Sequence, residues 1–231
     1  MASLDNYDVR LDYTPVEGLF LSGSIFYKEL TDTIEYSQFD SPQGFVYTSA
    51  VNYPKGTLIG GELEGRLKAA LLNENLEGLS FGLNATIINS QVTLPEDEQE
   101  YFATNGFPLV SRDMTGAPAY LFNANAVYEF EPTGTQLALF YTITGDTLET
   151  GAGIDEGAYI PSVYSKSYGT LNFTLQQYLT EHLKLFFQAK NLTNPEIQTV
   201  YRSPYLAEDI LSTSYTAGVD FSIGLSFQMD F

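Results

Sequence analysis

The sequence contains no cysteine, so a disulfide framework and a thiolate metal site are both excluded. It has one histidine, His182, in the segment LTEHLKL, where a turn or surface position is far more common than a metal-binding or catalytic one. Basic residues are scarce too, since 10 lysines and arginines face 29 acidic residues, for a formal net charge of -19. A nucleic-acid partner is therefore not expected, because phosphate binding requires a basic surface.

Long apolar runs are missing as well. No window approaches the roughly 18 consecutive apolar residues that indicate a membrane helix, although the half-apolar strands of a membrane barrel are not excluded. The first residues, MASLDNYDVR, lack the charged and apolar regions of an export signal. If the protein works outside the cytoplasm, we expect its natural beginning to lie upstream of this sequence.

The sequence does contain an alternation of apolar and polar residues, which is clearest in its last segment, Tyr215–Phe231. Apolar side chains occupy every second position from Val219 to Phe231, and small or polar residues lie between them. Successive side chains of a strand point to opposite faces, so a period of two predicts a strand. This strand exceeds the usual length of about 5 or 6 residues.

The same alternation recurs along the chain and places most basic residues on the polar faces. Predicted strands begin near residues 7, 19, 45, 79, 120, 137, 171, 183 and 215. Seven of the ten basic residues lie opposite the apolar faces: Arg10, Lys28, Arg66, Lys68, Lys166, Lys184 and Lys190. In the third strand, the residues YPKG predict a bulge, because proline and glycine interrupt a strand ladder.

The connections between these strands alternate in length. TPVEG, NENLEG, EPTG and LTEH are short turns, whereas SQFDSPQG and residues 93–118, 145–164 and 193–212 are long loops. Loops above about 12 to 15 residues are uncommon in compact domains, and this arrangement is typical of outer-membrane barrels. We predict an all-β, antiparallel, up-and-down transmembrane β-barrel with short periplasmic turns and long, mobile extracellular loops. A soluble sandwich, with the apolar faces as its core, is the alternative.

Four stretches resemble the C-terminal barrel region of TonB-dependent outer-membrane receptors. They are GGELEG (Gly60–Gly65), RDMTGAPAYLFNANAVYEF (Arg112–Phe130), KLFFQAKNLTNP (Lys184–Pro195) and the terminal AGVDFSIGLSFQMDF. Their order and spacing match, and the likeness covers nearly the whole chain. The resemblance implies a location in the bacterial outer membrane and contact with membrane lipids. It also implies that the C-terminal aromatics Phe231 and Phe227 signal to the barrel assembly machinery.

The chain also departs from that family's pattern. Such transporters have about 22 strands and a plugged lumen, whereas we count about nine strands here. No plug domain and no TonB-contacting segment precede the first strand, and single-chain bacterial barrels have even strand numbers. We therefore expect residues 1–231 to be the C-terminal part of a longer receptor barrel, with Met1 an artefact of truncation or gene calling. The TonB complex would be a partner only through the missing N-terminal region.

The resemblance implies that the intact receptor imports a scarce nutrient, such as a chelated metal, a vitamin or a glycan. A passive pore and a soluble binding or structural protein are the alternatives. An enzyme is not predicted, no cofactor is expected, and the residues that bind the small-molecule ligand cannot be assigned from the sequence.

One acidic pair and one acidic run contain residue types that could act in catalysis or bind a metal ion. Glu62 and Glu64 share one strand face, where solvation or pairing with Arg66 and Lys68 is the expected arrangement. The acidic run Glu96–Glu100 has oxygen ligands suitable for Ca²⁺, although a solvated loop is the more common interpretation of such a run. No catalytic residue and no metal site are therefore predicted.

Overall fold

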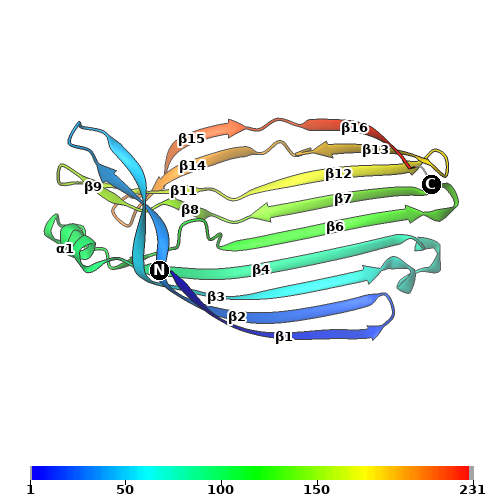
Figure 1. The fold of residues 1–231 in the computed structure, drawn as a ribbon, viewed down its shortest axis with the longest axis horizontal. Coiled ribbons are helices and arrows are strands. Elements are labelled where there is room, and N and C mark those ends of the chain that lie inside the picture. The colour runs from blue at the N-terminus through cyan, green and yellow to red at the C-terminus, as the bar shows by residue number, and fades with distance from the viewer. Residues whose placement is uncertain (1, 229–231) are drawn as a thin grey trace.

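The computed structural model describes residues 2–228, and its dominant feature is one long antiparallel sheet (Figure 1). Sequential strands are neighbours throughout, as in an up-and-down barrel wall. Among the described residues the path of this sheet has nine strands: β1 (Ser3–Val16), β2 (Leu19–Asp40), β3 (Val46–Lys68), β4 (Leu79–Thr93), β6 (Tyr120–Phe130), β7 (Thr135–Thr144), β12 (Tyr168–Tyr178), β13 (Leu183–Lys190) and β16 (Asp220–Phe227). The two-residue strand β5 (Ser111–Arg112) pairs with the end of β4. The predicted strand number is therefore confirmed.

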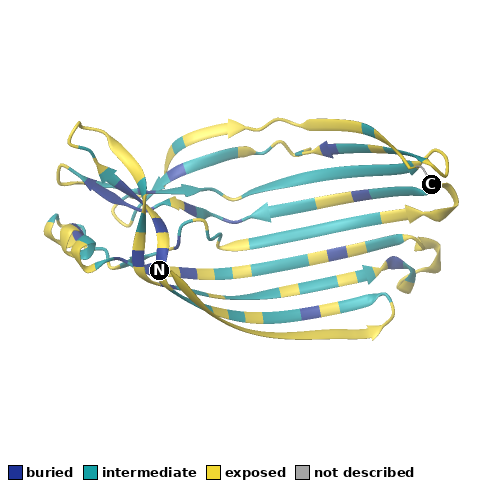
Figure 2. Cartoon of the chain, viewed as in Figure 1, coloured by how far each residue is buried: buried dark blue, intermediate teal, exposed yellow. Residues whose placement is uncertain are grey.

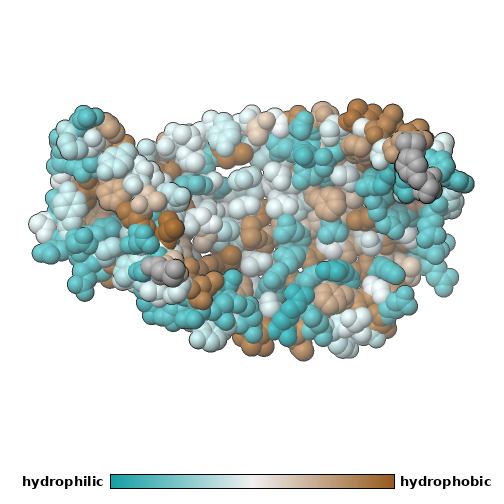
Figure 3. All heavy atoms as spheres, in the orientation of Figure 1, coloured by the Kyte–Doolittle hydropathy of each residue, from teal (hydrophilic) through white to brown (hydrophobic). Residues whose placement is uncertain are grey.

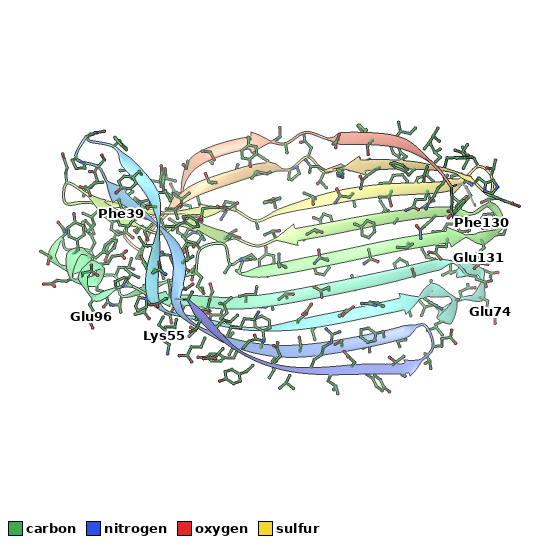
Figure 4. All side chains as sticks on the ribbon, in the orientation of Figure 1. Phe39, Lys55, Glu74, Glu96, Phe130 and Glu131 are labelled. Carbon is green, nitrogen blue, oxygen red and sulfur yellow. The ribbon has the colours of Figure 1, made fainter. Side chains whose placement is uncertain are left out.

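The short connections lie together at one end of the sheet, which we call the turn end, and the long ones lie at the outer end (Figure 1). Two of the turns contain 3-10 helices, which are η1 (Ala69–Leu71), η2 (Glu74–Leu76) and η3 (Glu131–Thr133). In Figure 4, Glu74, Phe130 and Glu131 mark the turn end, while Phe39 and Glu96 mark the outer end. Strands β6, β7 and β12 have 11, 10 and 11 residues, close to the roughly 9 to 11 residues that a tilted membrane strand needs.

One face of the sheet is apolar and exposed. Leu11 and Ile223 expose 75% and 74% of their surface, and similarly exposed apolar side chains recur at alternate positions of β1–β4 and β16. Figure 2 shows exposed residues alternating with less exposed ones along β2, β3 and β4, while β1 is exposed throughout. An apolar surface of this extent is disfavoured in water and fits a lipid environment. The apolar faces predicted from the sequence are the ones that the sheet exposes.

The described residues form an open wall, since β1 and β16 are its two edges and do not pair with each other. Every residue of β1 is exposed. An open edge carries unpaired N–H and C=O groups, which lipid cannot satisfy. A membrane-embedded form of this wall therefore requires further strands at both edges.

A glycine is required in β3 where the Phe26 ring of β2 packs against the backbone. Gly60 lies in β3, and a Cβ placed there would approach the carbonyl oxygen of Ile87 and a ring atom of Phe26 to 2.4 Å each. At the neighbouring Gly61 the same addition would approach the Ser24 carbonyl oxygen only to 3.3 Å. The first of the two glycines in GGELEG is thus needed for close packing of the polar face.

At the outer end, the chain forms further structure that we call the outer segments: residues 32–54, 94–118, 145–166 and 192–217. They contain helix α1 (Glu96–Thr104), a four-stranded sheet in the order β15 (Ile210–Thr216), β14 (Glu196–Arg202), β11 (Ser162–Ser165) and β8 (Thr147–Thr150), and a hairpin of β9 (Gly153–Asp155) and β10 (Ala158–Ile160). The long connections predicted over residues 145–164 and 193–212 therefore contain regular structure. Much of each segment is strand.

Strands β7, β12, β13 and β16 of the wall are each joined through a short break to a strand of the outer sheet, namely β8, β11, β14 and β15. The break between β13 and β14 is the NLTNP stretch, where Asn191 and Asn194 adopt positive φ values of 57° and 41°. The Asn191 side-chain amide donates to the Gly218 carbonyl oxygen at 2.7 Å, and the Gly218 N–H donates to Asn194 Oδ1 at 3.0 Å. Left-handed backbone suits asparagine and glycine, so this motif fixes a kink shared by two strand pairs.

The hairpin of β2 and β3 extends beyond the wall, and its two strands twist there (Figure 1). The register is the same on both sides, with Thr31 opposite Lys55 and Thr33 opposite Tyr53. The predicted bulge at YPKG is therefore wrong, because no residue is inserted. Asp32, with a φ of 53°, absorbs the irregularity instead.

Candidate functional site

Three of the four outer segments, those within residues 32–54, 94–118 and 145–166, share a buried hydrophobic core with the end of β4. Its members are Tyr53, Val92, Leu94, Phe102, Met114, Ala152 and Ile154. Figure 2 shows the densest burial at this end of the molecule, while most of the wall is intermediate or exposed. Because buried apolar area stabilises a structure by roughly 25 cal/mol per Å², this core holds α1, β9 and the extended hairpin as one packed layer.

An ion pair lies at the centre of this layer. Arg112 Nη1 is 3.0 Å from Glu35 Oε2, and the two side chains are only 5% and 1% exposed. The same carboxylate oxygen accepts from the N–H and the hydroxyl of Thr115, at 2.9 and 3.1 Å. A buried ion pair requires such additional hydrogen bonds to offset its desolvation. The pair joins β2 to β5, and Thr115 adds the segment that follows β5.

Arg112 makes four further contacts. Its guanidinium donates to the carbonyl oxygens of Asp113 and Tyr36 at 3.0 and 3.3 Å, and to Ser37 Oγ at 3.2 Å. It also lies 4.8 Å from the ring centre of Tyr53, which is a cation–π geometry. In the sequence, Arg112 is only the first residue of the motif RDMTGAPAYLFNANAVYEF. Its pairing with Glu35 cannot be predicted from the sequence, because the glutamate lies 77 residues earlier in the chain.

Tyr53 links this ion pair to helix α1. Its hydroxyl donates to Glu98 Oε1 at 2.6 Å and lies 2.9 Å from Ser37 Oγ. Burial raises the pKa of Tyr53 to about 12, and it raises the pKa of Glu98 as well, although the Tyr53 hydrogen bond opposes the latter shift. The acidic run Glu96–Glu100, expected as a loop, is in fact the start of α1, and one of its carboxylates attaches the helix to the hairpin.

A second ionic network lies where the wall meets the outer sheet. Asp146 accepts from Arg202 Nη2 at 2.7 Å and from Lys166 Nζ at 3.2 Å, and the Ser167 N–H donates to it at 2.8 Å. Asp209 pairs with the same two cations, at 2.7 and 3.5 Å. Burial opposes the ionisation of Asp146, yet these bonds hold its pKa below the ordinary value. Both basic side chains are thus neutralised by two carboxylates.

The outer segments are strongly acidic as a whole. They contain 15 acidic residues and three basic ones, a formal charge of −12. The acidic residues are Asp32, Glu35, Asp40, Glu96, Asp97, Glu98, Glu100, Asp113, Asp146, Glu149, Asp155, Glu156, Glu196, Glu208 and Asp209. The basic ones, Arg112, Lys166 and Arg202, are all in the ion pairs described above. On the face shown in Figure 3, hydrophilic residues cover much of the end that carries α1.

On the polar face of the wall, partly exposed charged side chains pair with one another. Glu64 pairs with Arg66 and with Arg10, which lies 3.0 Å away, and Glu62 accepts from the Asn84 amide. The predicted pairing of Glu64 with Arg66 is therefore confirmed, whereas Lys68 lies near Glu17 instead of near Glu62. A groove of about 440 Å³ runs along this face near the turn end. It is lined by Glu64, Arg66, Asn84, Asn123 and Asn125, among others.

No catalytic or metal constellation emerges from this geometry. In the part of the chain that the structure describes, no group of three or more histidine and acidic side chains could hold a metal ion. Within the same residues, no helix has both the length and the apolar character needed to cross a membrane. His182, at the β12–β13 turn, contacts the Phe227 ring with a centroid separation of 6.4 Å. Phe227 ends β16, while Phe231 lies outside the described residues.

Residues 3–192 match the family described as TonB dependent receptor-like, beta-barrel. The chain belongs to this family. Its members are β-barrel proteins of the outer membrane and act as receptors and transporters, not as enzymes. The resemblance noted in the four sequence motifs is thereby confirmed, and the open nine-stranded sheet is a partial receptor barrel.

Solved structures of receptors show the same fold at low sequence identity. The copper transporter OprC has a TM-score of 0.64 at 14% identity, over 98% of this chain and 31% of that chain. The FrpB iron transporter from Neisseria meningitidis (F3-3 variant) has a TM-score of 0.61 at 12% identity, over 98% and 31%. The ferric yersiniabactin uptake receptor FyuA from Yersinia pestis has a TM-score of 0.58 at 18% identity, over 97% and 29%.

The chain therefore spans less than a third of the length of these solved receptors. No match is found among the curated proteins. The comparisons agree with the open edges of the wall, since a sheet of this size can supply only part of a receptor barrel.

Proposed function

We propose that residues 1–231 form the C-terminal part of the barrel wall and the outer loops of a receptor that imports a scarce nutrient. Chelated metals, vitamins and glycans are the candidate classes. The observation that carries this proposal is that the outer segments pack around a hydrophobic core at one end of the sheet, whose strands are long enough to cross a membrane. Such a layer is a suitable place for capturing a ligand, because binding to ordered segments requires little reorganisation.

Two features favour this proposal over the alternatives. A soluble protein would not expose apolar side chains such as Leu11 and Ile223 over a whole sheet face. A passive pore needs a closed barrel, and the wall described here has two open edges. In our proposal the remaining strands, the plug and the segment that contacts the TonB complex belong to a longer protein.

Assembly of this protein involves membrane lipids and the barrel assembly machinery in our proposal. Phe227 and Phe231 are the aromatic residues that would be recognised. Support comes from the position of Phe227 at the end of an edge strand, with 64% of its surface exposed. Replacing Phe231 with alanine in the full-length receptor is expected to lower the amount of folded barrel in the outer membrane. Unchanged amounts of heat-modifiable barrel on gels would contradict this role.

The importer proposal is tested with the full-length gene in cells that lack other receptors. Uptake of radiolabelled ferric citrate, cobalamin and maltohexaose is measured with and without an uncoupler of the proton gradient. We expect one of these probes to accumulate, and the uncoupler to abolish its accumulation. Accumulation that persists in the presence of the uncoupler would favour a passive pore, and uptake of none of the probes would count against an importer of these classes.

A further inference from the structure

A groove of about 480 Å³ lies among the outer segments, between the β2–β3 hairpin and strands β10, β14 and β15. Its volume is in the range of small-molecule sites, which is about 300 to 1,000 Å³. Three tyrosine rings, an amide and a hydroxyl contribute to the lining, together with aliphatic side chains. The residues that matter for the argument are Gln38, Tyr47, Thr48, Tyr159, Pro161 and Tyr201.

The walls of this groove are held in place by hydrogen bonds and ring contacts of its lining residues. The Gln38 side-chain amide donates to the carbonyl oxygens of Gly151 and Pro161, at 3.0 and 2.9 Å. The Tyr159 ring centre lies 5.1 Å from those of Phe107 and Tyr205. A ligand would therefore meet a surface that is already ordered, and little of the binding free energy would be lost in ordering it.

The lining combines flat apolar rings with neutral hydrogen-bonding groups. Tyrosine suits a surface that is apolar on its ring faces and hydrated at its hydroxyl. Hydroxyls both donate and accept hydrogen bonds, and the Gln38 side-chain oxygen is an acceptor, whereas its amide N–H groups donate within the protein. None of the residues that line the groove is charged. This composition matches a ligand with C–H faces and many hydroxyls.

The charge of the outer segments narrows the ligand class further. Their formal charge of −12 repels a polyanion such as a ferric tris-catecholate or ferric citrate. The three cations that could compensate, Arg112, Lys166 and Arg202, are each held by carboxylates of the same layer. A cationic ligand would be attracted to this end but would meet no carboxylate in the groove itself. An uncharged ligand fits both observations.

We propose that this groove binds a neutral glycan, with Tyr47 and its neighbouring tyrosines stacking on sugar rings and the Thr48 hydroxyl and the Gln38 side-chain oxygen near the sugar hydroxyls. The inference rests on the proposed importer function and specifies its substrate class. Tyr47 is the best position to test it, because it is 45% exposed and its truncation leaves the buried core intact.

The test uses the purified full-length receptor and two sets of probes. A panel of neutral oligosaccharides, including maltohexaose and cellohexaose, is compared with ferric citrate and a ferric tris-catecholate by calorimetry. We expect saturable binding of at least one neutral oligosaccharide and none of either anion. Tyr47→Ala should weaken the oligosaccharide binding about tenfold, while Tyr101→Ala should change it less than twofold. Tyr101 is a matched control, since it is 48% exposed in α1 and lies outside the groove.

Three results would overturn the inference: no neutral oligosaccharide in the panel binds, an anionic chelate binds, or Tyr47→Ala and Tyr101→Ala have equal effects. The proposed function fails separately. If the receptor takes up a ferric chelate in an energy-dependent manner and Tyr47→Ala has no effect, the importer proposal stands and the glycan groove is wrong. If an oligosaccharide binds at the groove but the uncoupler does not reduce its uptake, the glycan-binding inference is supported and the proposal of an energised importer is wrong.

Discussion

The Glu35–Arg112 ion pair should control the stability of the outer segments without controlling that of the wall. In a Glu35→Gln variant the guanidinium loses the carboxylate with which it is paired while staying buried. Breaking a buried pair in this way costs about 3 to 5 kcal/mol. Because Arg112 keeps two carbonyl oxygens, a hydroxyl and the Tyr53 ring, we expect the low end, about 3 kcal/mol. This corresponds to a roughly hundredfold increase in local opening.

Hydrogen exchange in the full-length receptor measures this opening directly. The Thr115 amide, which donates to Glu35, should exchange about a hundred times faster in the variant. Amides of β6 and β7 should be unaffected. Glu149→Gln, which also removes one outer carboxylate but at an exposed position, is the control. Replacing both partners, Glu35→Leu with Arg112→Met, should restore much of the protection. A double variant that opens as readily as the single one would refute the reasoning.

Three further predictions concern the wall and the buried tyrosine. Leu225→Arg places a charge on the apolar face and should cost roughly 2 to 4 kcal/mol near the bilayer midplane, whereas Ser226→Arg should be tolerated; equal yields of folded barrel would contradict the assignment of faces. Gly60→Ala should lower barrel yield and Gly61→Ala should not, because only the first Cβ would clash. The stability that neutral Tyr53 contributes should be complete below pH 10 and lost as the pH rises towards about 12. Tyrosinate absorbance of wild type minus Tyr53→Phe should therefore titrate near pH 12, and a difference midpoint near 10 would count against burial.

The wall could be predicted because its side chains obey a local rule. A period of two depends only on the neighbours along the chain, and Leu225 and Ser226 are assigned to opposite faces by that rule alone. Turn and loop lengths then give the order of the strands. The local rule fails at two places. The segment that begins at Tyr215 is not one strand, because β15 ends at Thr216 and β16 begins at Asp220. Pro54 causes no bulge, because the irregularity is absorbed by the opposite residue, Asp32.

The outer segments could not be predicted, because their order comes from contacts between distant residues. The segment TGAGID has a composition typical of a flexible loop, yet its glycines are packed. A Cβ on Gly151 would lie 2.4 Å from Arg112 Nε, and one on Gly153 would lie 2.4 Å from the Gln38 carbonyl oxygen. Glycine here permits close approach instead of mobility. Nothing in the local sequence distinguishes the two uses.

The wall and the outer segments differ in whether their stability depends on residues outside this chain. The wall ends in two unpaired edges, so its stability in a membrane depends on strands outside this chain. The core of the outer segments, by contrast, is built from residues of three connections and the end of β4, which all belong to this chain, such as Tyr53, Phe102 and Ile154. Cooperative units open separately when few contacts join them. A substitution at Gly60 should therefore act on barrel assembly, and one at Glu35 on loop order, with little exchange between the two effects.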